Sequence, residues 1–176
     1  MHSGFETGRL TVRPFEVSDA PDVARMAGDP GVARMIGSAM SPYPVIAAEL
    51  WILTVRAGWD RKRPPNYAFA VTEKTGALAG SCGMFKRRGG ADWEIGYWIG
   101  RPFWGKGYAT EAGTGLMEWA RESLGAERFV ARHFEDNPAS GKVLEKLGFA
   151  YTGDAEPVFS LGRMGHAGSL DMVCET

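Results

Sequence analysis

The sequence has few cysteines and no long hydrophobic run. Its two cysteines, Cys82 and Cys174, stand in apolar surroundings without a neighbouring cysteine or histidine, so buried free thiols are expected rather than a disulfide. No apolar stretch approaches the ~20 residues that a membrane-spanning helix needs. The first residues also lack the basic and apolar regions of a signal peptide. These absences predict a cytoplasmic protein that holds no metal and does not associate with a membrane.

The charges are almost balanced. A formal net charge of −1 gives no electrostatic reason to expect nonspecific nucleic-acid binding. Apolar residues make up 44% of the chain and charged residues 23%, as in an ordinary globular protein. A chain of 176 residues fits one domain, residues 1–176, and can bury a sizeable core. The sequence leaves the oligomeric state open between a monomer and a homodimer.

The stretch 93–110, WEIGYWIGRPFWGKGYAT, joins a strand pattern to a helix pattern. Its first seven residues alternate, with Glu94, Gly96 and Trp98 on one face, as a strand requires. Apolar residues then recur at four-residue intervals through residue 124, which predicts an amphipathic helix. A glycine-containing turn lies between the two patterns.

That turn, Trp104-Gly-Lys-Gly-Tyr108, is the part of the stretch that indicates a ligand. A glycine-rich turn at a helix start exposes backbone N–H groups at the positive end of the helix dipole, and glycine lets an anion approach closely. The turn matches neither the Walker loop nor the dinucleotide fingerprint, and two glycines alone are a weak signal. A phosphate is the natural ligand of such a turn.

Patterns along the rest of the chain predict a mixed α/β sheet with helices. Strands are expected at 10–15, 67–71, 78–85, 93–99, 128–132 and 169–174, with weaker strand character at 149–151 and 157–161 and a loop at 162–168. Helices are expected at about 18–27, from 45 onward, at 110–124 and at 137–148. Short turns between early strands indicate an antiparallel meander, whereas the later helices indicate crossovers.

The helix expected from Val45 carries a broad apolar set. Ile46, Leu50 and Leu53 recur at helical spacing, so this face is expected to pack on the core or to line a cleft. Tyr43 and Trp51 are expected to border that cleft, where an acceptor substrate would bind. The alternative for an aromatic beside an apolar helix face is simple core packing.

Two motifs in order resemble those of the GNAT N-acetyltransferases, especially the ribosomal-protein N-terminal acetyltransferases. FWGKGYATEA at 103–112 is similar to the family's cofactor motif, and DNPASGKVLEKLGF at 136–149 is similar to its second motif. The resemblance implies a single GNAT domain with a largely antiparallel sheet of about six to seven strands, flanked by about four helices. Acetyl-CoA would be the co-substrate, bound where the strands of that sheet splay apart.

The resemblance also implies roles for individual residues. The main chain of Trp98 and Ile99 would pair with the pantetheine arm, and Asn137 and Ser140 would approach the sulfur. Lys142 would meet the phosphate side, with a solvated lysine on a polar helix face as the alternative. The residues expected around the pyrophosphate are Trp104, Gly105, Lys106, Gly107, Tyr108, Ala109 and Thr110.

Acyl transfer to an amine needs a base, a polarised carbonyl and a proton for the leaving thiolate. Glu94 is the candidate base, directly or through water, with a solvent-facing carboxylate as the alternative. A backbone N–H near Gly96, freed if that glycine marks a bulge, would polarise the carbonyl. Many GNAT enzymes carry a tyrosine as the acid where this chain has Leu144, so Ser140 or water becomes the candidate.

The predicted function is transfer of an acetyl group from acetyl-CoA to a primary amine by direct attack on the thioester. The branch resemblance favours a protein or peptide N-terminus, whose α-amine has a reference pKa of ~7.7–8.0 and needs less help from a base than a lysine at ~10.4. Small-molecule acetylation of a polyamine, amino acid or aminoglycoside is one alternative. A non-catalytic acyl-CoA-binding module is the other.

Overall fold

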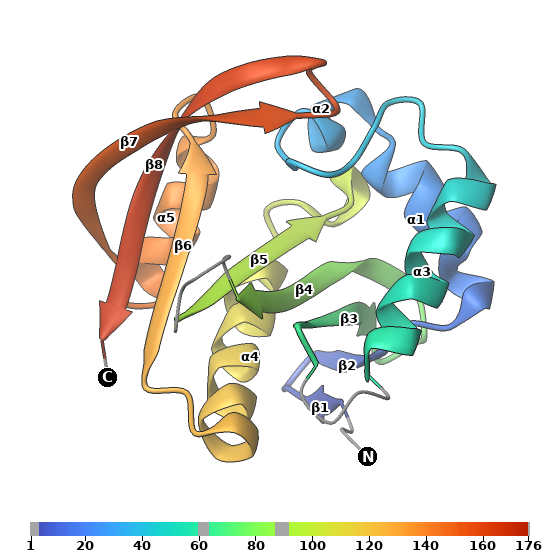
Figure 1. Ribbon diagram of the computed structural model, residues 1–176. Helices are drawn as coiled ribbons and strands as arrows, with labels where there is room; N and C mark the ends of the chain where they lie inside the picture. Colours follow the sequence, from blue (N-terminus) through green and yellow to red (C-terminus); the bar gives the residue numbers. More distant parts are fainter. Residues whose placement is uncertain (1–3, 60–63, 87–91, 176) are drawn as a thin grey trace.

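The computed structural model describes residues 4–59, 64–86 and 92–175 and contains one mixed sheet with helices on both faces (Figure 1). The strands are β1 (Phe5–Glu6), β2 (Leu10–Pro14), β3 (Asn66–Glu73), β4 (Leu78–Lys86), β5 (Trp93–Ile99), β6 (Arg128–Phe134), β7 (Ala150–Ser160) and β8 (Gly165–Glu175). The helices are α1 (Ala20–Ala27), α2 (Pro30–Ala33), α3 (Val45–Trp59), α4 (Tyr108–Leu124) and α5 (Pro138–Lys146). Two short 3-10 turns are η1 (Val17–Asp19) and η2 (Arg101–Phe103).

The strand order is β1-β2-β3-β4-β5-β6-β8-β7, and every neighbouring pair is antiparallel except β5 with β6. This confirms the predicted mixed, largely antiparallel sheet. The sheet has eight strands. One of them, β1, spans two residues and is too short to leave a readable period. The two weak strand patterns after residue 148 form one strand, β7, and β8 begins at Gly165, inside the expected loop.

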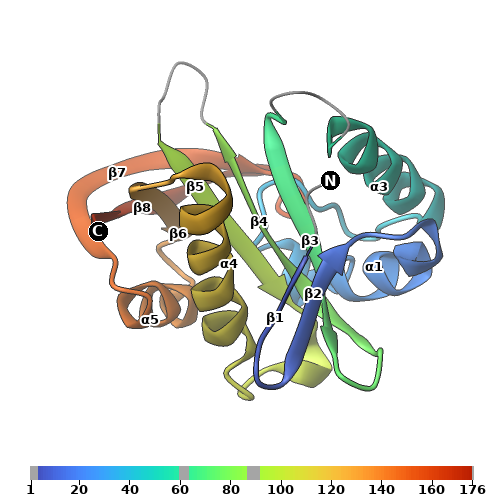
Figure 2. The same ribbon diagram turned by 90° about the horizontal axis from the view of Figure 1, so that it is seen from below.

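Two apolar clusters lie on opposite faces of the sheet. Phe69 and Val71 of β3 belong to the cluster under α4, whereas Ala70 between them belongs to the cluster under α1 and α3. This alternation is the two-residue period of a strand with both faces covered. Figure 2 shows the layers edge on, with α4 and α5 on one side of the sheet and α1 and α3 on the other.

The parallel pair β5 and β6 stays together for a very short distance. Backbone pairing between the two strands occurs at Trp93 with Phe129 and at Glu94 with Val130, and their later residues are not paired with each other. In Figure 1 the carboxyl ends of β5 and β6 point apart. The sheet therefore splits in its middle, and the split begins at Glu94.

The inward face of α3 contains Ile52 and Val55, which are buried, whereas Ile46, Leu50 and Leu53 are 61, 58 and 49% exposed. Of the two alternatives predicted for these three side chains, packing on the core is therefore excluded, and their exposure is compatible only with lining a cleft. Because α3 is apolar around most of its circumference, helical period alone does not identify which stripe meets the sheet.

Replacing Ile52 with alanine should destabilise the protein by about 2–5 kcal/mol, because it removes a fully buried side chain and leaves a cavity. Leu53→Ala on the same helix is the matched control and should change stability by less than about 0.5 kcal/mol. Urea denaturation followed by circular dichroism measures both. Equal losses in the two variants would contradict this orientation of α3.

Candidate active site

The edge of β5 supplies backbone groups to the split in the sheet. Gly100 N–H donates to Ala79 O at 2.8 Å, and hydrogen-bonded pairs alternate along an antiparallel ladder, so Trp98 lies opposite Ser81 at a hydrogen-bonded position. Ile99 is turned the other way, and its carbonyl accepts a bond from Trp104 Nε1 at 2.6 Å. The predicted pantetheine contact thus narrows to Ile99, since the main chain of Trp98 is directed to β4.

Gly96 does not form the expected bulge on the β4 side. The register between β4 and β5 runs without a shift from Gly80 opposite Ile99 to Lys86 opposite Trp93. The exposed edge of β5 arises instead because β6 departs after Glu94. The backbone N–H groups on this edge are available to a ligand for that reason, and no irregularity of β5 is needed.

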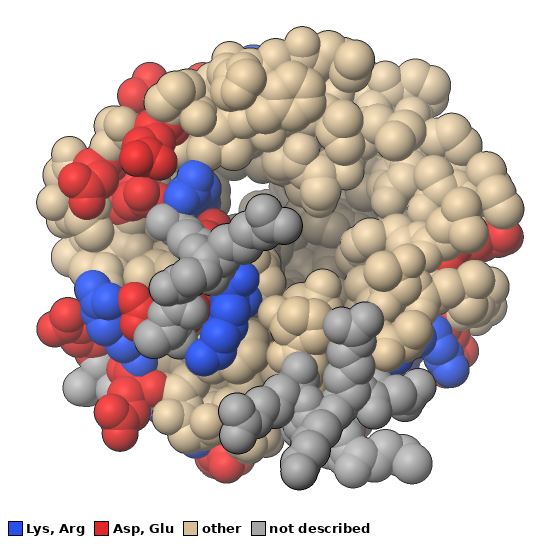
Figure 3. Space-filling view, in the orientation of Figure 1, with Lys and Arg blue, Asp and Glu red and all other residues tan. Residues whose placement is uncertain are grey.

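The split opens into a hollow on the face of the molecule seen in Figure 3. The hollow lies between the surface of the β7–β8 hairpin at the top and that of α3 at the right. It passes deep between the two halves of the sheet. A ligand in the split would therefore be reachable from this face.

The turn before α4 has the geometry of an anion site. Gly105 and Gly107 have φ values of +76° and +79°, which favour glycine. The first helical bond joins Glu111 N–H to Gly107 O at 3.1 Å, so the N–H groups of residues 108–110 have no acceptor within the helix. A Cβ on Gly105 would meet no atom within 4 Å. Open space thus lies at the positive end of a helix dipole, a position that favours an anion such as a phosphate.

The side chains of Lys106 and Tyr108 are directed to Glu73 at the end of β3. Tyr108 donates its hydroxyl proton to Glu73 Oε1 at 2.7 Å, and Lys106 Nζ lies 3.1 Å from the same oxygen. These hydrogen bonds hold the pKa of Glu73 below its usual range, and the bond to Glu73 raises the pKa of Tyr108. Both residues are therefore left with main-chain groups to offer a phosphate.

Arg9 and Glu111 brace the turn from the β1–β2 side, a contact that the sequence analysis missed. Arg9 donates through Nη1 to Lys106 O at 2.9 Å and through Nε to Glu111 Oε2 at 2.7 Å. Thr7 donates to Glu111 Oε1 at 2.6 Å. Burial raises the pKa of Glu111, but the hydrogen bonds from Thr7 and Arg9 outweigh it and leave that pKa lowered. Thr7 and Arg9 lie in the turn between β1 and β2, and Glu111 is more than 100 residues away along the chain, so no local signal marks this role.

The start of α5 forms the opposite wall of the split. Asn137 caps the helix, its Oδ1 accepting from Ser140 N–H at 3.3 Å. Ser140 Oγ lies 2.9 Å from the hydroxyl of Tyr97, which also donates to Ser140 O at 3.1 Å. Burial raises the pKa of Tyr97 to about 12, with the Ser140 hydrogen bond acting in the opposite direction. Lys142 is exposed on the outer side of α5, as a solvated lysine would be.

Glu94 lies at the point where the split begins. It is only 6% exposed, which argues against the solvent-facing alternative. Arg132 Nε on β6 lies 3.5 Å from Glu94 Oε1 and 3.3 Å from Asp171 Oδ1 on β8. The guanidinium offsets the cost of burying two carboxylates here. Arg132 and Asp171 were not identified from the sequence, because their pairing depends on strands that are distant along the chain.

Tyr43 and Trp51 belong to the second apolar cluster. Trp51 packs edge on against Phe15, with ring centroids 4.9 Å apart, and Tyr43 packs against the same cluster, where burial raises its pKa. These contacts favour the core alternative over the acceptor-cleft prediction for both aromatics.

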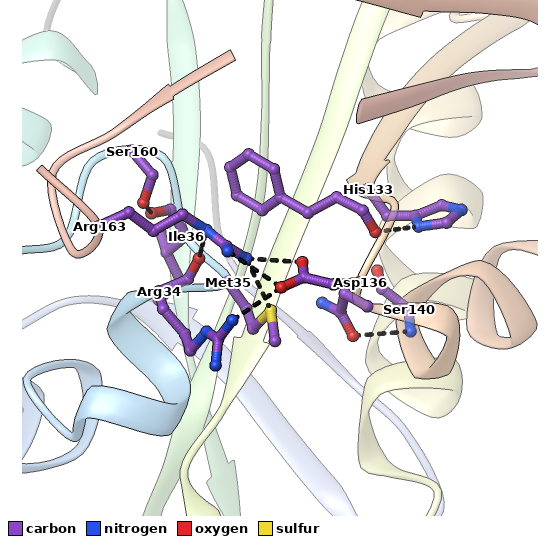
Figure 4. A network of polar contacts seen from close by, with 10 residues as sticks. Arg34, Met35, Ile36, His133, Asp136, Ser140, Ser160 and Arg163 are labelled. Carbon is purple, nitrogen blue, oxygen red and sulfur yellow. Dashed lines mark hydrogen bonds and ion pairs between the residues drawn. The ribbon is translucent and has the colours of Figure 1, made fainter. Parts of the chain in front are cut away.

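Arg163 in the β7–β8 turn joins two loops that have no regular structure (Figure 4). It makes a two-bond contact with Asp136 at 2.7 and 3.0 Å and donates to Arg34 O at 2.7 Å. The pKa of Asp136 is lowered, chiefly by the Arg163 hydrogen bond. Gly162 lies so close to the main chain of Ala33 that a Cβ would stand 2.4 Å from its carbonyl oxygen. The loop after α2, the hairpin turn and the start of α5 are therefore fixed to one another.

Comparisons with known proteins show the family of the chain. Residues 9–150 match the family model of the acetyltransferase (GNAT) domain. The chain is 30% identical over 149 residues to the uncharacterized N-acetyltransferase p20 of Bacillus licheniformis, covering 84% of this chain and 82% of that protein. The chain belongs to the GNAT acetyltransferase family, and it is an acetyl-CoA-dependent acyltransferase.

Solved structures share the fold at lower identity. The microcin C7 self-immunity acetyltransferase MccE, in complex with acetyl-CoA and AMP, aligns with a TM-score of 0.83 at 17% identity over 100% of this chain and 98% of that one. The ribosomal-protein-S5-alanine acetyltransferase of Vibrio fischeri aligns with a TM-score of 0.80 at 19% identity over 98% of this chain and 96% of that one.

Within residues 4–59, 64–86 and 92–175, no group of three or more histidine, cysteine, aspartate or glutamate side chains could hold a metal ion. Over the same ranges, no helix has the length and apolar character that a membrane crossing requires.

Gly105→Val should raise the Kd for CoA by about tenfold or more, because the new side chain enters the space meant for the phosphates and disfavours the positive φ. Gly76→Val is the matched control, since Gly76 has a φ of +92° and equally open surroundings in the β3–β4 turn. Its Kd should stay at the wild-type value despite similar backbone strain. Isothermal titration calorimetry with CoA measures both, and wild-type affinity in Gly105→Val would rule out this turn as the phosphate site.

Proposed function

We propose that this acetyltransferase acts on the α-amine at the N-terminus of a protein or peptide. The observation that carries the proposal is the position of Glu94, buried where β5 and β6 part and on the sheet face that α1 and α3 cover. A single carboxylate suffices for an α-amine, which is partly neutral near pH 7.5, whereas a lysine amine needs a stronger arrangement. The similarity in fold to a ribosomal-protein-S5-alanine acetyltransferase supports the same acceptor class.

In this proposal the residues divide the work by position. Acetyl-CoA supplies the activated acetyl group. Backbone groups on the free edge of β5, with Ile99 among them, hold the pantetheine arm, and the turn at Gly105 and Gly107 holds the phosphates. Glu94 takes a proton from the acceptor amine, directly or through water. Ser140 or water hydrogen-bonds to the departing sulfur.

A small-molecule acceptor is the second candidate. The observation in its favour is the likeness of the fold to MccE, whose structure holds AMP beside acetyl-CoA. The junction made by Arg163 and Asp136 limits how far the loops beside the hollow can open, which suits a compact acceptor. A non-catalytic acyl-CoA-binding module would need no base at Glu94.

An acceptor screen separates these candidates. With acetyl-CoA present, release of free thiol is measured over a panel of short peptides with different first residues, and over polyamines, amino acids and aminoglycosides. Turnover with peptides that have a free α-amine, and none with the same peptides blocked at that amine, is the expected result. Turnover confined to small molecules would support the second candidate, and no turnover anywhere would support the binding module.

Glu94→Gln should lower turnover by about 10²–10⁴-fold, because the amide keeps the shape of the side chain but accepts no proton. The Kd for CoA should remain unchanged, since the phosphate turn is untouched. Asp171→Asn is the matched control, because Asp171 contacts the same Arg132 nitrogen. It should lower turnover less than about tenfold, below the range of a lost general base. Equal losses would show that the effect comes from disturbing Arg132.

A further inference from the structure

Tyr97 connects the two walls of the split through Ser140. It projects from β5, and its hydroxyl reaches two oxygens of one residue on α5, the main-chain oxygen of Ser140 at 3.1 Å and Oγ at 2.9 Å. The ring packs against the main apolar cluster, so the phenol cannot move far.

A phenol has one proton, so its two contacts with Ser140 cannot both be donated. When Tyr97 donates to Ser140 O, the proton of Ser140 Oγ is directed to the phenol oxygen. When Tyr97 donates to Oγ instead, the Ser140 proton is released to another acceptor. The direction of the Ser140 hydroxyl is thus decided by which oxygen Tyr97 bonds.

Changing between these two arrangements leaves no buried group without a partner. Ser140 lies in the first turn of α5, so its carbonyl oxygen also takes the helical bond from the residue four positions later. It remains satisfied when Tyr97 turns away. Leu144 is that residue, and its apolar side chain, 1% exposed, offers no competing proton.

We propose that Tyr97 is a positioning residue that turns the Ser140 hydroxyl proton toward the departing sulfur of CoA. The proposal rests on the role proposed above for Ser140. As the carbon–sulfur bond breaks, its electron pair stays on sulfur, and Ser140 donates a hydrogen bond to the thiolate while Tyr97 donates to Ser140 Oγ. The sulfur then takes up one proton from water, and Glu94 returns to water the proton that it took from the acceptor nitrogen, so the protons balance.

The phenol keeps its proton at working pH. Burial raises the pKa of Tyr97 to about 12, so the hydroxyl is a donor below that value and its effect should not vary between about pH 6 and 9. Tyr97 is therefore a stable donor and not a pH switch.

The test measures the thiol pKa of CoA bound to the protein, from the ultraviolet absorbance of the thiolate, against ~8.5 for a free thiol. The wild type should lower this pKa. Tyr97→Phe and Ser140→Ala should each raise it by about 1 unit, a tenfold loss of thiolate stabilisation. The double variant should stay within about 0.3 unit of Ser140→Ala, because Tyr97 acts through Ser140.

Tyr67→Phe, which removes a hydroxyl from the same apolar cluster, is the control and should leave the bound thiol pKa unchanged. The melting temperature of each CoA complex distinguishes the positioning role of Tyr97 from a purely structural one. A purely structural role would lower the melting temperature without moving the thiol pKa. An unchanged thiol pKa in Tyr97→Phe would overturn the proposal. So would a further rise of about 1 unit when Tyr97→Phe is added to Ser140→Ala.

The measurement needs no acceptor, so it is independent of the acceptor screen. A failed screen would reject the proposed acceptor and leave this result standing. An unshifted thiol pKa in Ser140→Ala would remove Ser140 from the mechanism and would overturn the role of Tyr97 with it.

Discussion

The separation of β5 and β6 after two paired residues is the constraint on which the site depends. A strand edge inside a sheet cannot leave its N–H and C=O groups without partners at low cost. Here the gap is spanned by side chains: Tyr97 crosses to α5, and Trp104 bonds the Ile99 carbonyl. The edge groups that remain are suited to an extended ligand that adds to β5 as a strand would. The split in the sheet is thus the place in the fold where an extended ligand can complete the pairing of β5.

Much of this site could be predicted from the sequence, because its central parts are local. The strand alternation before Ile99, the glycines of the turn and the Asn137 cap each appear within a few residues, and each forms the expected element. Contacts between distant segments leave no such pattern. The Arg163–Asp136 junction and the Glu94–Arg132 pair join residues from different elements, so no period or motif in the sequence predicts them. The sequence did not decide which stripe of α3 faces inward, for another reason: an apolar helix offers several equivalent faces.

Arginines hold the irregular segments in place around the split. Arg9 fixes the turn before α4, and Arg163 fixes the loop after α2 and the hairpin turn against α5. Each of their ion pairs has one partner that is about half exposed, Arg9 at 55% and Asp136 at 45%, and such pairs contribute about 0–1 kcal/mol each, so global stability is not their main effect. The planar guanidinium groups donate several hydrogen bonds in fixed directions. These bonds define the geometry of loops that lack a regular ladder of backbone hydrogen bonds. Loop position here follows from directional bonding more than from binding energy.

In the proposed function the two substrates are held by different kinds of structure. The proposed cofactor site consists largely of main-chain groups on β5 and at the start of α4, because the side chains of Lys106 and Tyr108 are directed to Glu73. Such a site depends on backbone conformation and tolerates changes of side chain, so chains of about 20% identity can keep the same fold around it. The acceptor side depends on side chains and on the loops that Arg163 joins. Changes there can alter the acceptor while the cofactor site stays the same, which is why cofactor choice follows from two short motifs and acceptor choice does not.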